Sequence, residues 1–175
     1  MLRDGSGATL RVTQPADHDA LRRFFHELSP ESHRHRFFSL CGPTELLIDA
    51  FCDSSNPKRQ ATMVALRPID GELRPIAVGS YLGIGTAVAE AAFAIGDAFQ
   101  GKGLGTILLA SLAMMAAANG FSRFEATVLP ENNAMLEVFR DSGFEVRSIA
   151  ERGAVTVFLS LRPTTKPGAE GRPVS

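Results

Sequence analysis

The sequence has few of the residues that cross-link a small protein. Its 175 residues contain two cysteines, Cys41 and Cys52, and no tryptophan. Two cysteines are too few for a disulfide framework. A chain of this length can instead bury a sizeable hydrophobic core without disulfides, metals or a partner chain.

A charge excess of either sign is also missing. The 18 lysines and arginines nearly balance the 19 aspartates and glutamates, which gives a formal net charge of −1. Nucleic-acid-binding domains normally carry a basic excess, so we expect no nucleic-acid partner. A phosphorylated cofactor remains compatible with this balance, because it needs only a local anion site.

Long hydrophobic runs are absent as well. No stretch approaches the roughly 18–20 consecutive apolar residues of a transmembrane helix, and the polar residues 1–8 lack the apolar core of a secretory signal. We therefore expect a cytoplasmic protein with no membrane partner. Residues 1–162 are expected to form a single domain. Residues 163–175 are rich in proline and glycine, which predicts a disordered C-terminal tail.

Apolar periodicity predicts helices first, then an antiparallel meander, then alternating strands and helices. The expected helices cover residues 17–28, 29–38, 43–52, 103–119 and 130–142. The expected strands cover residues 8–13, 60–66, 76–82, 88–95, 123–129, 144–149 and 154–161, with a hairpin turn at Asp70-Gly71. This order predicts an α+β fold whose mixed central β-sheet of about six to seven strands is flanked by helices.

The most informative segment is a glycine-rich loop between a strand and the longest expected helix. It reads Gln100-Gly101-Lys102-Gly103-Leu104-Gly105. Glycines let main-chain N–H groups approach a ligand closely, and the start of the next helix adds unpaired N–H groups and the positive end of its dipole. Together they predict an anion site that suits a pyrophosphate.

Three nucleotide-type motifs compete for this loop. Residues 96–102 begin a Walker A motif, but Gly103 stands where Ser or Thr would bind Mg²⁺. A G-x-G-x-x-G motif begins at Gly101, but its last position is Thr106. The third motif, Gln/Arg-x-x-Gly-x-Gly/Ala, is met in full and holds the pyrophosphate of an acyl-coenzyme A. The plainer alternative is a glycine-rich turn that only leads into a helix.

Residues 88–144 resemble the GNAT superfamily of N-acetyltransferases. The loop precedes residues 130–144, which resemble the family segment E-N-x-x-A-x-x-x-Y-x-x-x-G-F. Within the superfamily, Ser29-Pro30-Glu31-Ser32, Arg36-Phe37-Phe38 and Ala89-Glu90-Ala91-Ala92-Phe93 are similar to the acetyltransferase domain of bacterial Pat-type protein lysine acetyltransferases.

This resemblance implies the GNAT fold and direct transfer of an acetyl group from acetyl-CoA to an amine, without a metal. The expected acceptor is a protein lysine, for example on a metabolic enzyme. A small-molecule amine is the alternative acceptor. A non-catalytic module that senses acyl-CoA is the alternative class of protein.

Glu90 is the predicted general base. It lies within a strand among the small apolar residues Val88, Ala92 and Ala94. Partial desolvation beside an open groove would raise the pKa of such a carboxylate toward a useful range. The resemblance to the Pat-type domain places the catalytic glutamate at the same position. The alternative is a solvated glutamate on an open sheet face.

The resemblance also implies a cofactor site. The main chain of Ala92, Phe93 and Ala94 would pair with the pantetheine arm and polarise the thioester. The glycine loop would hold the pyrophosphate, with Lys102 adding charge. Asn132 would hydrogen-bond the pantetheine region or cap a helix. Arg140 would reach a phosphate or remain in solvent.

One position departs from the family pattern. Phe139 occupies the place of a tyrosine that protonates the departing thiolate in many members, and phenylalanine cannot donate a proton. The general acid is therefore unassigned.

The histidines and cysteines do not predict a metal site. His33, His35, Cys41 and Cys52 match no standard zinc spacing. Both cysteines are expected in the core. The run Arg34-His35-Arg36 is expected on a solvated helix face.

Overall fold

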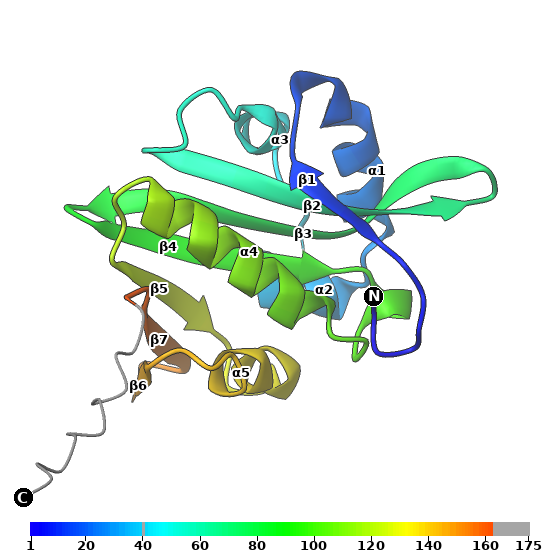
Figure 1. Cartoon of the computed structure of the whole chain (residues 1–175). Coiled ribbons are helices and arrows are strands. Elements are labelled where there is room, and N and C mark those ends of the chain that lie inside the picture. Colours follow the sequence, from blue (N-terminus) through cyan, green and yellow to red (C-terminus); the bar gives the residue numbers. More distant parts are fainter. Residues whose placement is uncertain (40, 163–175) are drawn as a thin grey trace, which may run out of the picture.

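The structure is a computed structural model that describes residues 1–39 and 41–162. A seven-stranded sheet has the order β1-β2-β3-β4-β5-β7-β6 (Figure 1). The strands are β1 Thr9–Val12, β2 Gln60–Ile69, β3 Glu72–Gly85, β4 Val88–Ile95, β5 Arg123–Val128, β6 Val146–Glu151 and β7 Ala154–Ser160. The helices are α1 His18–Glu27, α2 Pro30–Phe37, α3 Glu45–Cys52, α4 Leu104–Ala118 and α5 Asn133–Arg140, with 3₁₀ turns η1 Pro15–Asp17 and η2 Asp97–Phe99.

These elements confirm the predicted α+β fold with a mixed sheet. The β4–β5 pair is parallel, whereas the other neighbours in the sheet are antiparallel. The predicted tail, residues 163–175, lies outside the described residues. The organisation as one domain over residues 1–162 stays a prediction.

Helices cover both faces of the sheet. On one face α4 buries Leu104, Leu108 and Leu112 in a core cluster that also includes strand residues and Phe139 of α5. On the other face, the cluster from α1 and α3 includes Leu21 and packs on the central strands. Figure 1 shows α4 running along the near face of the sheet, with α2 behind it.

The central feature is a divergence between β4 and β5. The two strands pair only at Val88, Ala89 and Glu90, opposite residues 123–125. Beyond Glu90, β4 continues to Ile95 along β3 alone, while β5 continues along β7. The main chain of β4 after Glu90 therefore has a free edge facing a gap in the sheet.

Three predicted boundaries were wrong for identifiable reasons. Asp70 and Gly71 both have positive φ, 51° and 82°, so a tight two-residue turn lets β2 and β3 pair up to the turn itself. Helix α5 begins at Asn133 instead of Pro130, because the Asn132 side chain accepts a hydrogen bond from the Met135 N–H and caps the helix there. Helix α1 spans His18–Glu27 instead of residues 17–28, and the Asp17 carboxylate before it accepts hydrogen bonds from Arg11 and from the Gln14 N–H, each at 2.7 Å.

Candidate active site

The glycine loop takes the conformation that its glycines allow. Gly101 and Gly103 have φ of 75° and 88°, and Gly103 is the N-cap of α4. Gly105 has a different role, because a Cβ there would lie 2.9 Å from Cγ2 of Val138 on α5. Two glycines therefore shape the loop, while the third permits close packing of α4 on α5.

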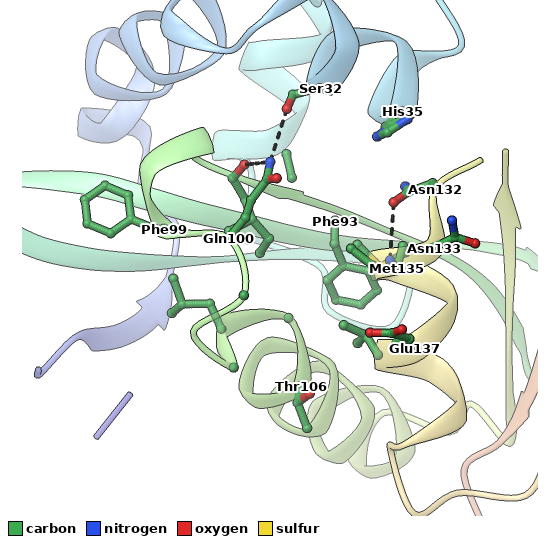
Figure 2. A pocket seen from close by; sticks show the side chains of 18 of the residues that line it. Ser32, His35, Phe93, Phe99, Gln100, Thr106, Asn132, Asn133, Met135 and Glu137 are labelled. Carbon is green, nitrogen blue, oxygen red and sulfur yellow. Dashed lines mark hydrogen bonds between the residues drawn. The ribbon is translucent and has the colours of Figure 1, made fainter. Parts of the chain in front are cut away.

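The loop forms one end of a cavity of about 360 Å³. The other walls come from α2, β4 and the start of α5 (Figure 2). The cavity brings together most of the predicted cofactor residues: Phe93, Ala94, Gln100, Gly101, Gly103, Leu104, Gly105 and Asn132. It also includes residues that sequence patterns missed: Arg3, Ser32, His35, Thr106, Asn133 and Met135.

Two predicted cations do not line this cavity. The Lys102 ammonium is 2.9 Å from the Asp4 carboxylate, and hydrogen bonds from Ser6 and Lys102 hold the pKa of Asp4 well below its usual range. The Arg140 side chain is 69% exposed, and its nearest carboxylates are those of Glu137 and Asp141. Arg3 lines the cavity instead, and its main-chain N–H donates to the Lys102 carbonyl at 3.0 Å.

A polar network attaches the loop to α2. The Asp97 carboxylate accepts hydrogen bonds from the Ser29 N–H and hydroxyl and from the Ser32 hydroxyl, at 3.0, 2.8 and 2.8 Å. The Gln100 amide donates to Ser32 and to the Ile95 carbonyl, both at 3.2 Å. The Gln100 side chain thus fixes the loop, which leaves ligand binding to the loop's main chain.

Asp97→Asn should weaken this network by about 1 kcal/mol at pH 7. Burial would raise the pKa of Asp97, but the hydrogen bonds from Ser29 and Ser32 outweigh it and lower the pKa below 3.8. The stabilisation that Asp97 provides is therefore complete above its unfolded-state pKa of 3.8. It is lost as the pH falls through the lower pKa of the folded state. Thermal melting from pH 7 to pH 2.5 should show a smaller acid-dependent loss of stability in the variant. An equal acid-dependent loss of stability in the wild type and the variant would contradict this role of Asp97.

A second, smaller cavity of about 50 Å³ lies in the gap between β4 and β5. Glu90 and Ala92 line it from β4, and Ala126 and Thr127 line it from β5. Glu90 lies among small residues, as expected, but it is exposed, so the expected partial desolvation of its carboxylate is not met.

The two cavities share a boundary. His35, Phe93, Asn132 and Met135 line both of them. Figure 2 shows His35 on the α2 side, across from Asn132 and Met135. The glycine-loop cavity and the Glu90 cavity are therefore adjacent.

The prediction that Arg34-His35-Arg36 lies on a solvated helix face holds for Arg34, which is 49% exposed, but is wrong for His35 and Arg36. Arg34 forms an ion pair with Glu131, whereas Arg36 is partly buried, lines the Glu90 cavity and donates to the Ser80 hydroxyl at 3.1 Å. Burial lowers the pKa of Arg36 to about 10, and the Glu90 carboxylate opposes that change. An arginine with this pKa remains charged at neutral pH, so a cation lies beside the predicted base.

Phe139 is a core residue that also borders the small cavity. It is 2% exposed, and its ring centroid lies 6.1 Å from that of Phe93 in an edge-to-face arrangement. The aromatic pair forms the floor of the boundary region, and the position cannot supply a proton.

Phe139→Tyr should lower stability by roughly 1–3 kcal/mol and give no gain in turnover. The new hydroxyl would be buried in an apolar environment without a partner. Thermal melting and steady-state kinetics on this single variant test the expectation. A clear increase in turnover would show that the thiolate lacks a donor and that a phenol at this position supplies one.

The described residues contain no group of three or more His, Cys, Asp or Glu side chains placed to hold a metal ion.

Cys52 is buried, as expected, but Cys41 is exposed, so the expectation that both cysteines lie in the core was wrong for Cys41. Within the described ranges, no helix combines the length and apolar character needed to cross a membrane.

The site thus combines a split parallel strand pair with a glycine loop and the start of a long helix. The sequence matches the acetyltransferase (GNAT) family over residues 18–144. The chain therefore belongs to the GNAT family of acetyltransferases, and the predicted GNAT fold is confirmed.

Individual relatives agree with this assignment. Acetyltransferase PA5475 of Pseudomonas aeruginosa is 30% identical over 82% of this chain and 77% of its own length. Acetyltransferase Pat of Mycolicibacterium smegmatis is 30% identical over 78% of this chain, but the match covers only 41% of that longer protein. The GNAT domain of S. lividans PAT matches with a TM-score of 0.80 and 32% identity over 91% of this chain and 93% of that domain. The predicted closeness to Pat-type domains is thus confirmed.

Proposed function

We propose that the enzyme transfers an acetyl group from acetyl-CoA to a protein lysine, with Glu90 as general base. The observation that carries this proposal is that the glycine-loop cavity and the Glu90 cavity are adjacent and share four lining residues. One cavity ends at an anion-binding loop and the other at a carboxylate.

The cofactor would lie along the larger cavity. Main-chain N–H groups of the glycine loop and the first turn of α4 suit its pyrophosphate, and Arg3 adds a cation at that end. The pantetheine amides would pair with the free edge of β4 at residues 92–94, where no strand pairs on the β5 side. This pairing directs the thioester toward the boundary with the small cavity.

The acceptor amine must be neutral when it attacks. A free lysine has a pKa of roughly 10.4, so at neutral pH most of it is protonated. Glu90 would take a proton from the amine, and the main chain of β4 would stabilise the negative charge that develops on the thioester oxygen. The Arg36 cation beside Glu90 disfavours a second positive charge there, which favours the neutral amine.

A lysine side chain suits the shape of the acceptor side. The Glu90 cavity is small, about 50 Å³, and opens beside exposed apolar groups. Phe38 on its rim is 48% exposed, and Leu82, the β3 partner of Glu90, is 45% exposed. Apolar surface around a narrow opening can contact the methylenes of an extended lysine while its amine reaches the carboxylate. Residues 29–32, 36–38 and 89–93 resemble Pat-type protein lysine acetyltransferases, and this resemblance supports a protein lysine as acceptor.

The test is mass spectrometry after incubation with isotope-labelled acetyl-CoA and a cell extract. The proposal expects labelled acetyl groups on lysines of a limited set of proteins, and none with Glu90→Gln. Label found only on small amines would replace the protein acceptor by a metabolite. Binding of acetyl-CoA without transfer to any acceptor would indicate a sensor.

A further inference from the structure

His35 is the titratable group at the boundary of the two cavities. It lines both of them, together with Phe93, Asn132 and Met135, and its side chain is 20% exposed. A cofactor that runs from the glycine loop toward Glu90 must bring its sulfur past this boundary. The imidazole therefore faces the region where the carbon–sulfur bond breaks.

One nitrogen of His35 lacks a hydrogen-bond partner. Nε2 is buried and accepts or donates no hydrogen bond within residues 1–39 and 41–162. The nearest carboxylate, that of Glu31, is 4.0 Å away. Buried polar atoms are normally paired, and leaving one unpaired costs about 1–3 kcal/mol. A buried nitrogen without a partner, on a residue that lines both cavities, calls for a functional explanation, and a bound group can supply the missing partner.

The charges around His35 are mainly acidic. Besides His35, the ionisable residues that line the two cavities are Arg3, Glu31, Arg36, Glu90, Asp97, Glu131, Glu137 and Asp141. His35 is close enough to Glu131 that its charge contributes, after hydrogen bonds that include one from Arg34, to lowering the pKa of that carboxyl. An imidazole that carries a proton on the ring nitrogen facing a ligand can donate it.

We propose that His35 is a catalytic residue that donates a proton to the departing coenzyme A sulfur. This role rests on the proposed acetyl transfer. His35 would be the general acid, a function that Phe139 cannot perform. His35 reaches the boundary from α2, the opposite wall from α5, which carries Phe139.

The amine nitrogen bonds to the thioester carbon and gives its proton to Glu90. The carbon–sulfur bond then breaks, its electron pair goes to sulfur, and His35 passes a proton to that sulfur. The products are the amide and the coenzyme A thiol. Solvent returns a proton to His35 and removes one from Glu90, so the enzyme is restored without any co-reactant.

The first test needs no acceptor. Imidazole nitrogen NMR signals of the full chain are recorded with saturating coenzyme A and with desulfo-coenzyme A, which lacks the sulfur. The signals of His35, assigned by their loss in His35→Gln, should differ between the two ligands, whereas those of His18, His26 and His33 should not. If His35→Gln does not fold, glutamine variants of the other three histidines assign the signal by elimination.

The outcomes separate this inference from the proposed function. Equal His35 signals with both ligands would overturn the role of His35 while leaving acetyl-CoA binding intact. Failure of both ligands to bind would overturn the proposed function itself.

The second test is kinetic, and its acceptor is an unmodified peptide that contains a lysine found to be acetylated in the extract experiment. His35→Gln should lower kcat by about 10–10²-fold, the low end of general acid catalysis, because a thiolate is weakly basic. The KM for acetyl-CoA should stay within about threefold. The wild type should lose kcat at alkaline pH, and this alkaline limb should vanish in the variant.

The matched control is His26→Gln, which removes an exposed imidazole on α1 that lines neither cavity. It should leave kcat and its pH profile unchanged. A rise in KM without a fall in kcat for His35→Gln would mean that His35 only binds the cofactor and would overturn the inference. If His35→Gln loses kcat at alkaline pH as the wild type does, the inference is also overturned.

Discussion

Glu90→Gln should lower turnover by about 10²–10⁴-fold near neutral pH, while coenzyme A binding changes little. Glutamine keeps the shape of the side chain but cannot take a proton from the amine. The deficit should shrink at high pH, where solvent deprotonates the amine. Steady-state kinetics between pH 6 and pH 10, with calorimetric titration of coenzyme A, measure both effects.

Glu125→Gln is a matched control for this variant. Glu125 is the β5 partner of Glu90 in the parallel register, but it pairs with Arg123 and lines neither cavity. Such a partly exposed ion pair contributes little to stability, so the control should fold and turn over normally. If the turnover of Glu90→Gln also stays within a few-fold of wild type, Glu90 is not the general base.

Gly103→Val should reduce coenzyme A affinity at least tenfold, equivalent to about 1.4 kcal/mol. Gly103 has φ of 88°, a conformation that a β-branched residue adopts only with strain. The loop must therefore rearrange, and its main-chain N–H groups no longer converge on the pyrophosphate. Calorimetric titration checks the affinity, and melting curves check that the variant is folded.

Substitutions at two other glycines serve as comparisons for Gly103→Val. Gly85→Val, at the end of β3, adds a Cβ with nothing within 4 Å and should leave affinity unchanged. Gly105→Val should act mainly on stability, because its Cβ would meet Val138 at 2.9 Å. A folded Gly103 variant with full affinity would place the cofactor elsewhere in the protein.

Local patterns in the sequence were enough to predict the elements that build the site. The bounds of β4, Val88–Ile95, were predicted as observed, because its apolar run is bounded by turn residues. The glycine loop was predicted because it combines positive-φ residues with a following helix. Glu90 stood out because it is the one charged residue of that strand.

Contacts between distant segments could not be predicted in this way. Lys102 follows the cationic pattern of a phosphate loop, yet Asp4 of the N-terminal segment pairs with it, and Arg3 lines the cavity instead. The run Arg34-His35-Arg36 has no apolar periodicity that would signal burial. Only the packing of α2 against β4 places Arg36 beside Glu90, and His35 at the boundary of the two cavities.

A crystal structure with bound acetyl-CoA tests the central claim most directly. The account predicts the pyrophosphate against the main chain of the glycine loop, the pantetheine along the free edge of β4, and the acetyl group at the boundary formed by Phe93 and Asn132, pointing toward Glu90. A cofactor bound outside the gap between β4 and β5, or an acetyl group pointing away from Glu90, would contradict it.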